Sequence, residues 1–416
     1  MELTGGNAKN VDAGDLAVAG DSSTHVHDAV HRSDPAPMFV VEAAHDLIEL
    51  TRREHDWREL AERTAGMNVF YEPDVFLPAV RSFGASKRSI YLFVYRQATS
   101  GAAELVGFLP FEKAYEFQWP YVPRLSAWRH PYGFLNEPLI DLRFAEQAWL
   151  ALARWLRSQQ AWMPLIEIEL FNADGANYDA FRAAGREDNW RICVVDHFER
   201  ASLSCETGGW DMALNATISK PRRKEYARQR RRLAELGRLE FRTLGQADDV
   251  GIWLNRFLQL ERSGWKGRVQ TAILDDPAHV DYYCSVCRAL FARGRLSMLG
   301  IYLDDKPIAM KCNYLSGRGC FTIKIAFDEA YAKFSPGVLL EFENVRNASS
   351  QPDLRWFDSC AVPRHPMIDK VWGGRRTIEH VLVSPATRAG NAILSAFELA
   401  RMLKRKARRS IQLGKW

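Results

Sequence analysis

The sequence repeats one order of predicted elements, and this repeat limits the folds that the chain can adopt. Each half begins with helical periodicity, continues with apolar strands joined by short turns, and ends with a strand–helix–strand unit. The turns are clearest in the second half, where Asp304-Asp305-Lys306 and Ser316-Gly317-Arg318-Gly319 separate three apolar runs. Helices that alternate with antiparallel hairpins favour an α/β (α+β) fold. We therefore predict two similar domains, each a mixed, mostly antiparallel sheet flanked by helices.

The predicted elements are most simply given as residue ranges. The first half has helices at 46–63, 143–159 and 176–184, with strands at 90–95, 105–111, 165–171 and 190–203. The second half has helices at 221–236, 248–263, 279–293 and from 335 to about 348, with strands at 296–303, 307–315, 320–327, 354–359 and 377–383. A basic helix follows from about residue 387.

Composition and charge divide the 416 residues into four parts. Residues 1–37 lack aromatic side chains and carry six acidic and two basic residues, so we expect them to be disordered. Residues 38–205 and 206–386 are the two predicted domains. Residues 387–416 form a basic C-terminal helix and tail.

Two short segments are strongly basic. Residues 219–238 carry nine basic and two acidic residues, and residues 401–416 carry seven basic residues and no acid. Such segments attract anionic partners, so transfer RNA or a membrane surface is a possible partner at both, although a solvated helix face is the commoner explanation.

The sequence also predicts the compartment. It contains no apolar run long enough to cross a bilayer and no secretory leader, and its seven cysteines do not suggest a disulfide framework. We therefore expect a cytoplasmic protein without a transmembrane segment.

A bend after the strand at 320–327 is a candidate phosphate site. Proline and glycine start a helix here, and a helix start leaves N–H groups that bind anions. Glycine also lets a ligand approach the backbone. The predicted cofactor-binding residues are Ser335, Pro336, Gly337, Val338 and Leu339.

Several stretches resemble one family. They are Leu260-Glu261-Arg262-Ser263-Gly264-Trp265-Lys266-Gly267, Ile308-Ala309, Ala326-Phe327-Asp328-Glu329-Ala330-Tyr331 and Ser335-Pro336-Gly337, together with Phe357-Asp358-Ser359-Cys360-Ala361, His365-Pro366-Met367-Ile368 and Trp372. Together they resemble the CelD-type branch of the GNAT acetyltransferase superfamily, which is associated with cellulose and polysaccharide biosynthesis. Of the usual Arg/Gln-x-x-Gly-x-Gly/Ala pyrophosphate loop, only Gly337 is present.

The resemblance implies tandem GNAT-like domains, the second of which binds acyl-CoA (acetyl-CoA) and transfers the acyl group to an amine. A small-molecule or glycan amine is the implied acceptor. Two alternatives remain open: a Fem-like transferase that uses aminoacyl-tRNA, and a GNAT-like binding protein without catalysis.

Acyl transfer needs a base for the amine, a donor for the oxyanion and an acid for the leaving group. The predicted catalytic residues are Asp358 and His365 as bases and Tyr331 as the acid. Backbone N–H groups of the strand before Ser335 are the predicted oxyanion donors. Capping for Asp358 and packing for Tyr331 are the structural alternatives.

Four further residues are assigned to the acceptor or the charged groups of the donor: Trp265, Lys266, Lys324 and Trp372. Lysines bind carboxylates and phosphates, and a tryptophan between two glycines can form a pocket wall. Cys284 and Cys287 have Cys-x-x-Cys spacing without a second pair, so we predict core cysteines and no metal.

Overall fold

The computed structural model describes residues 38–413 apart from 65–67, 85–87, 98–100, 116–121, 159–162 and 206–208, and it places no side chains for residues 211 and 405–413. The predicted disordered segment 1–37 lies outside the described residues, as do the side chains of most of the basic tail. In the described part, no helix is both long and apolar enough to cross a bilayer.

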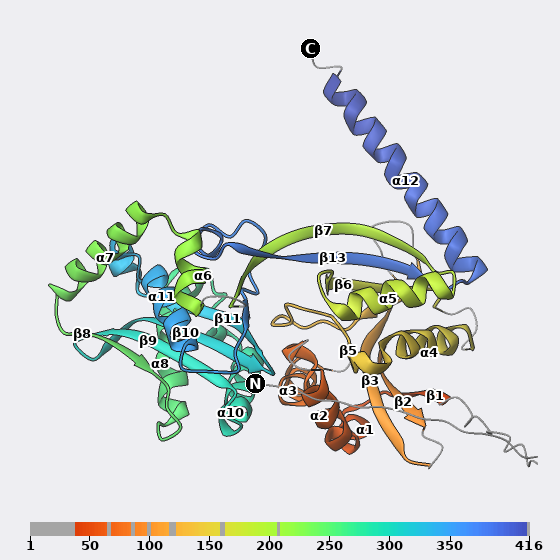
Figure 1. Ribbon diagram of the computed structural model, residues 1–416, viewed down its shortest axis with the longest axis horizontal. Helices are drawn as coiled ribbons and strands as arrows, with labels where there is room; N and C mark the ends of the chain where they lie inside the picture. Colours follow the sequence, from red (N-terminus) through yellow and green to blue (C-terminus); the bar gives the residue numbers. More distant parts are fainter. Residues whose placement is uncertain are drawn as a thin grey trace, which may run out of the picture. The chain divides into compact units, whose positions relative to one another are not determined.

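One thirteen-stranded sheet runs through the described part (Figure 1). Its order is β1-β2-β3-β4-β6-β13-β7-β12-β11-β10-β9-β8, and β5 pairs with β3. Among the strand pairs of the described residues, only β4–β6 and β11–β12 are parallel. The predicted α/β class, with a mixed and mostly antiparallel sheet flanked by helices, is confirmed. The strands are β1 (Met38–Ala44), β2 (Ser89–Gln97), β3 (Ala103–Ala114), β4 (Arg124–Ala127), β5 (Leu139–Ile140), β6 (Leu165–Asn172), β7 (Arg191–Ser204), β8 (Leu239–Thr243), β9 (Leu296–Leu303), β10 (Lys306–Ser316), β11 (Gly319–Phe327), β12 (Trp356–Asp358) and β13 (Gly374–Ser384).

The two halves of the chain share their central strands. β13 comes from the second half of the sequence but lies between β6 and β7, and it pairs with both in antiparallel fashion. β7 then pairs through its last three residues with β12. The predicted pair of sheets is therefore joined into one, and the division at residue 205 stays a prediction.

Helices cover both faces of this sheet. They are α1 (Leu47–Arg52), α2 (Glu54–Arg63), α3 (Pro73–Phe83), α4 (Ala145–Ser158), α5 (Ala176–Glu187), α6 (Gly209–Thr217), α7 (Lys220–Ala234), α8 (Val250–Ser263), α9 (Trp265–Arg268), α10 (Pro277–Ala292), α11 (Pro336–Ala348) and α12 (Arg388–Leu413). Successive side chains of a strand point to opposite faces of the sheet, so the apolar side chains on each face decide where the helices pack. In the first half, Ile166 and Ile168 of β6 and Val381 of β13 pack beneath α4 and α5.

The second half has the same two-sided arrangement. Met298 of β9 packs on the side of α8 and α10, whereas its neighbour Leu299 packs on the side of α7 and α11. Asp249 and Asp276 begin α8 and α10, and each side chain accepts a hydrogen bond from a backbone N–H of its helix. The predicted helices at 248–263 and 279–293 are therefore present.

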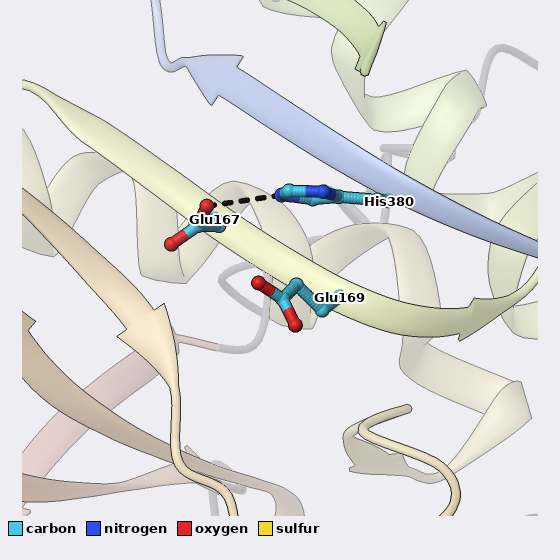
Figure 2. A group of neighbouring side chains, drawn as sticks. All are labelled: Glu167, Glu169 and His380. Carbon is cyan, nitrogen blue, oxygen red and sulfur yellow. Dashed lines mark hydrogen bonds and ion pairs between the residues drawn. The ribbon is translucent and has the colours of Figure 1, made fainter. Parts of the chain in front are cut away.

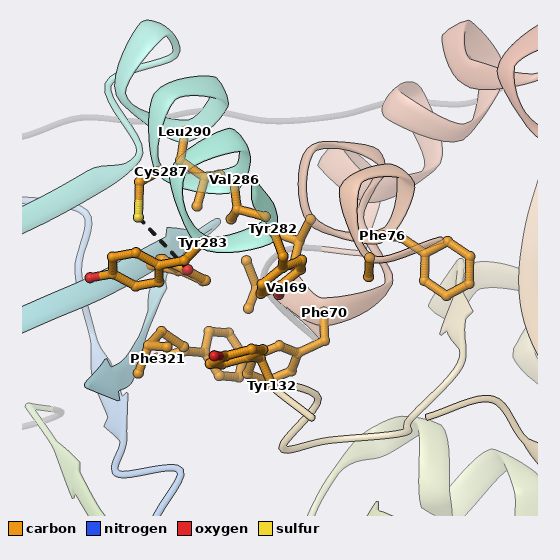
Figure 3. Packing of buried hydrophobic residues seen from close by; sticks show 14 of the residues in the cluster. Val69, Phe70, Phe76, Tyr132, Tyr282, Tyr283, Val286, Cys287, Leu290 and Phe321 are labelled. Carbon is orange, nitrogen blue, oxygen red and sulfur yellow. Dashed lines mark hydrogen bonds between the residues drawn. The ribbon is translucent and has the colours of Figure 1, made fainter. Parts of the chain in front are cut away.

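An aromatic core joins the two halves (Figure 3). The ring of Phe70 meets Phe321 of β11 edge to face, with centroids 5.5 Å apart. Tyr132 stacks on Tyr282 of α10 at 4.9 Å. Such contacts bury large apolar areas, so they hold the first half against the face of β11 where the candidate site lies.

Candidate functional site

The edge of β11 is the first feature of the site. β11 pairs with β12 only over Gly319–Phe321, because β12 ends at Asp358 while β11 continues to Phe327. Beyond Phe321, no strand in the described part of the chain pairs with this edge. Because backbone N–H groups alternate between the two edges of a strand, those that do not face β10 point toward this edge, and their role as oxyanion donors stays a prediction.

Two of the predicted lysines meet at one buried carboxylate beside this edge. Lys266 of α9 lies with its Nζ 2.6 Å from Oε1 of Glu261 in α8, and Lys324 Nζ of β11 lies 3.5 Å from the same oxygen. The other oxygen of Glu261 accepts the backbone N–H of Ile273 at 2.9 Å. The Glu261 side chain is only 1% exposed, so both lysines are held in fixed positions.

Electrostatics hold this group in its charged form. Burial opposes ionisation of Glu261, but the charges of Lys324 and Lys266 outweigh it and lower the pKa of the carboxyl. Burial also lowers the pKa of Lys324, and Glu261 only partly offsets this effect. Lys324 is thus a partly desolvated cation that loses its proton more easily than an exposed lysine.

A small cavity opens beside the lysines. It has a volume of about 50 Å³ and lies between α8, α9 and the end of β11, with Trp265, Lys266 and Phe327 in its wall. Trp265 is 57% exposed, and its backbone N–H donates to Glu329 at 2.8 Å. The structure therefore brings together three of the predicted site residues, Trp265, Lys266 and Lys324.

The first half of the chain adds a tyrosine–histidine pair to this place. Lys324 Nζ lies 5.1 Å from the centre of the Tyr132 ring, a distance at which the ring face attracts a cation. The Tyr132 hydroxyl is 3.0 Å from Nδ1 of His279 in α10. Burial raises the pKa of Tyr132, so the hydroxyl keeps its proton. A hydroxyl, an imidazole and an ammonium group thus lie in one chain of contacts.

The predicted cofactor segment starts α11 as expected, but it is largely covered. Pro336, Gly337 and Leu339 are buried, whereas Ser335 and Val338 are partly exposed. A Cβ added to Gly337 would lie 3.1 Å from the sulfur of Met367 and 3.7 Å from Ile325. Met367 therefore occupies the space on one side of the bend, and the cofactor role of Ser335–Leu339 stays a prediction.

Asp358 lies in a different environment from the one that its predicted role as base requires. It is fully buried and accepts hydrogen bonds from Arg200 at 2.5 Å and from Arg376 at 2.6 Å. We expected desolvation to raise its pKa. Burial does act in that direction, but the two arginines prevail and lower the pKa below its ordinary value. The arrangement therefore favours a structural ion pair.

The other predicted residues lie apart from the lysines. Nδ1 of His365 accepts the N–H groups of Met367 and Ile368, both at 3.3 Å, and so caps a short turn. Tyr331 packs partly buried in the cluster beneath α7 and α11. Trp372 is fully buried against Phe357, so the acceptor role predicted for it has no exposed surface to act through.

A second polar group lies on the central strands (Figure 2). Glu167 and Glu169 of β6 and His380 of β13 offer ligand atoms within 4.8 Å of one another. Arg124 pairs with Glu167 at 2.6 Å, Arg129 pairs with Glu169, and His380 Nε2 lies 2.9 Å from Glu167. Each carboxylate therefore already has an arginine partner, and these contacts account for the cluster without an ion. The absence of a metal stays a prediction.

Sequence reasoning missed three residues of the site. Glu261 lies inside a stretch that we quoted for the family resemblance, but nothing in the sequence distinguished it from a surface acid. Tyr132 and His279 are 147 residues apart, and each is unremarkable in its own segment. Only the packing of the two halves brings them together.

Comparisons with known proteins found a family match for one segment of the chain. Residues 220–363 match the family model described as an acetyltransferase (GNAT) domain. No curated protein matches the sequence. The family match covers less than half of the chain, and it shows that residues 220–363 resemble a GNAT acetyltransferase domain.

Among solved structures, FemX has a TM-score of 0.51 at 11% identity, covering 82% of this chain and 97% of that chain. Two others have lower scores. L-PGS from Bacillus licheniformis has a TM-score of 0.41 at 12% identity, covering 74% of this chain and 88% of that one. A tandem GNAT protein from the clavulanic acid biosynthesis pathway has 0.39 at 12%, covering 83% and 98%.

The matched residues 220–363 include Glu261, Lys266, Lys324 and the edge of β11. The likeness to FemX concerns the fold alone. The CelD-type branch stays a prediction.

Proposed function

We propose that this protein is an N-acyltransferase that transfers an acyl group, in the simplest case acetyl, from acyl-CoA to an amine on a small molecule or glycan. The observation that carries this proposal is the meeting of Lys266 and Lys324 at buried Glu261, beside the unpaired edge of β11 and inside the segment that matches a GNAT domain. A role of the enzyme in polysaccharide or envelope biosynthesis is part of the proposal, and this part rests on the family resemblance.

The site residues fit the electrostatic needs of the reaction. The neutral amine attacks the thioester carbonyl, a C–N bond forms, and the C–S bond breaks to release the thiolate. Negative charge develops on the carbonyl oxygen, and an N–H group of 322–327 together with the Lys324 ammonium stabilises it. Because Glu261 holds Lys324 in place, little reorganisation accompanies this step.

Protons must leave the amine and reach the thiolate. We assign the role of base, which takes the proton from the amine, to His279. Its Nδ1 faces the Tyr132 hydroxyl, and its ring is one-third exposed. Lys324 is the proton donor for the thiolate, since burial lowers its pKa and makes proton release easier. In this assignment Asp358 and His365 keep structural roles.

An aminoacyl-tRNA donor is the second candidate, and two observations favour it. Met367 covers Gly337, where the pyrophosphate of coenzyme A was expected. The helix α7 also presents exposed arginines such as Arg222 and Arg231, which suit a phosphate backbone. The chemistry at Lys324 is the same with an ester donor, except that the leaving group is a ribose hydroxyl.

The test combines donor binding with a lysine variant. Calorimetric titration with acetyl-CoA and longer acyl-CoAs measures binding, and mass spectrometry of the purified protein detects a retained thioester. Lys324→Met should reduce acyl transfer by about 10²-fold or more, the usual effect of removing one oxyanion donor. Lys370→Met, at an exposed lysine, is the matched control and should keep full activity.

If no acyl-CoA binds and salt-sensitive binding of aminoacyl-tRNA is found instead, the second candidate replaces the first. If neither donor binds, or Lys324→Met transfers the acyl group as fast as the control, the proposed function is wrong.

A further inference from the structure

A cavity on the outer face of α11 has no role in the chemistry described above. Its volume is about 220 Å³, and it lies between α6, α7, β8 and α11. The α11 residues in its wall include Leu339, Phe342 and Glu343, which follow one face of the helix at intervals of three and four residues. Leu339 also belongs to the predicted cofactor segment, so the cavity begins two residues after Gly337.

The rim of the cavity is cationic. Three arginines line it, Arg223, Arg230 and Arg346, and among the described side chains of its wall Glu343 is the one acid. Glu343 pairs with Arg346 at 2.7 Å and with Arg230 at 3.5 Å, so one carboxylate is shared by two guanidinium groups. Arg223 donates to the neutral side chain of Asn215 at 2.7 Å. The rim thus carries an excess of positive charge that a phosphate would neutralise.

Apolar and aromatic side chains also line the cavity, and its two closest rings meet edge to face. Tyr226 of α7 and Phe342 of α11 lie with ring centroids 5.5 Å apart, and Leu339 lies beside them. Arg230 is placed over the ring of Phe241 at 4.6 Å, which fixes the position of its guanidinium group. Aromatic rings beside arginines are suited to an aromatic base that carries a phosphate.

The size of the cavity limits what enters it. Pockets for drug-sized ligands measure roughly 300–1,000 Å³. About 220 Å³ therefore suits one base with its sugar phosphate, and not a complete carrier. The remainder of such a carrier would leave the cavity along α11.

We propose that this cavity between α6, α7 and α11 binds the adenosine phosphate end of the acyl donor. The proposal rests on the proposed function, because both candidate donors, acyl-CoA and aminoacyl-tRNA, end in an adenosine that bears phosphate. It moves the nucleotide from the covered bend at Gly337 to the outer face of the same helix. The acyl end then extends past the start of α11 toward β11.

Adenosine 3′,5′-bisphosphate is the probe for this site, measured by calorimetry on the full chain. Ala227→Trp fills the cavity from the exposed side of α7 without a change of charge, and Ala234→Trp on the same helix, away from the cavity, is its control. Arg223→Gln with Arg230→Gln removes two rim charges. Arg228→Gln with Arg232→Gln removes two charges from α7 outside the cavity, and this pair is the matched control.

The probe should bind the wild type, and each of the two cavity variants should weaken binding by at least about tenfold, as expected when charge-assisted hydrogen bonds or the space itself are lost. Both controls should bind as the wild type does. Equal losses in the matched arginine pairs would show a general charge effect and would overturn the proposal, as would the absence of probe binding. Melting temperatures check that every variant is folded. If Ala227→Trp does not fold, the arginine variants alone test the proposal.

Competition identifies the donor. Coenzyme A displaces the probe if the donor is acyl-CoA. If the donor is aminoacyl-tRNA, intact tRNA displaces it and tRNA stripped of its terminal adenosine does not. Displacement by neither refutes a donor site. If acyl transfer occurs and Ala227→Trp leaves the KM for the donor unchanged, this inference fails while the proposed function stands. If the probe binds as expected but no donor is turned over, the proposed function fails instead.

Discussion

Replacement of Asp358 by asparagine separates a structural role from a catalytic one. The Asp358 side chain is 0% exposed, and its partners Arg200 and Arg376 are 2% and 16% exposed. The neutral amide would leave two guanidinium groups in a buried site without their counter-charge. Removal of one partner from a buried ion pair lowers the free energy of unfolding by about 3–5 kcal/mol. We therefore expect Asp358→Asn to lower it by at least about 3 kcal/mol.

The matched control is Asp305→Asn. Asp305 also contacts two arginines, Arg238 at 2.8 Å and Arg242 at 2.5 Å, but its side chain is 65% exposed. Water replaces the lost contacts at an exposed site, so we expect little change in stability. Urea unfolding followed by tryptophan fluorescence measures both variants against the wild type.

The pH dependence gives the sign of the effect. The pKa of Asp358 is lower in the folded protein than in the unfolded chain, so its contribution is fully present above the unfolded pKa of about 4. The difference in stability between wild type and Asp358→Asn should therefore be constant from neutral pH down to about pH 5 and should shrink below about pH 4. If the free energy of unfolding of Asp358→Asn equals that of the wild type while acyl transfer is abolished, the structural role of Asp358 is refuted. The predicted role as base would then regain support.

Three further predictions concern the core, the thiols and the polar cluster. Phe321→Ala removes the ring that contacts Phe70 of the first half. We expect it to lower the free energy of unfolding, measured in urea, by about 3–5 kcal/mol. A change near zero would contradict the conclusion that an aromatic core joins the two halves. Burial raises the pKa of the Cys320 thiol, so in the native protein it should resist alkylation, whereas half-exposed Cys205 should react; mass spectrometry of the modified peptides compares them. Treatment with a chelator should leave activity and melting temperature unchanged, because Glu167 is already paired with Arg124; a loss that zinc or manganese restores would instead make the cluster a metal site.

The sequence predicted the local structure well where turn residues separate apolar runs. Asp304 and Asp305 adopt positive φ angles between β9 and β10, as a tight turn requires, and aspartate tolerates this conformation. The prediction missed α3, which contains Pro78 within the helix, and the short edge strand β8. Interior proline and very short strands both weaken the periodic signals on which such predictions depend.

The candidate site was only partly predictable. Trp265, Lys266 and Lys324 were identified from residue type and resemblance, and they lie together. Asp358 was identified as a carboxylate at a strand end, but its arginine partners lie 158 and 18 residues away in the chain, so their effect on its pKa was invisible.

Sequence alone determined the α/β class, the order of strands and helices from β9 to β13, and the lysines of the site, because these depend on hydrophobic period, turn chemistry and short motifs within single segments. Tertiary structure alone decided that β13 enters the sheet between β6 and β7, that Tyr132 and His279 meet beside Lys324, and that Met367 covers Gly337. These features depend on the packing of segments more than a hundred residues apart or on side chains that fill space between elements, and no local pattern encodes either.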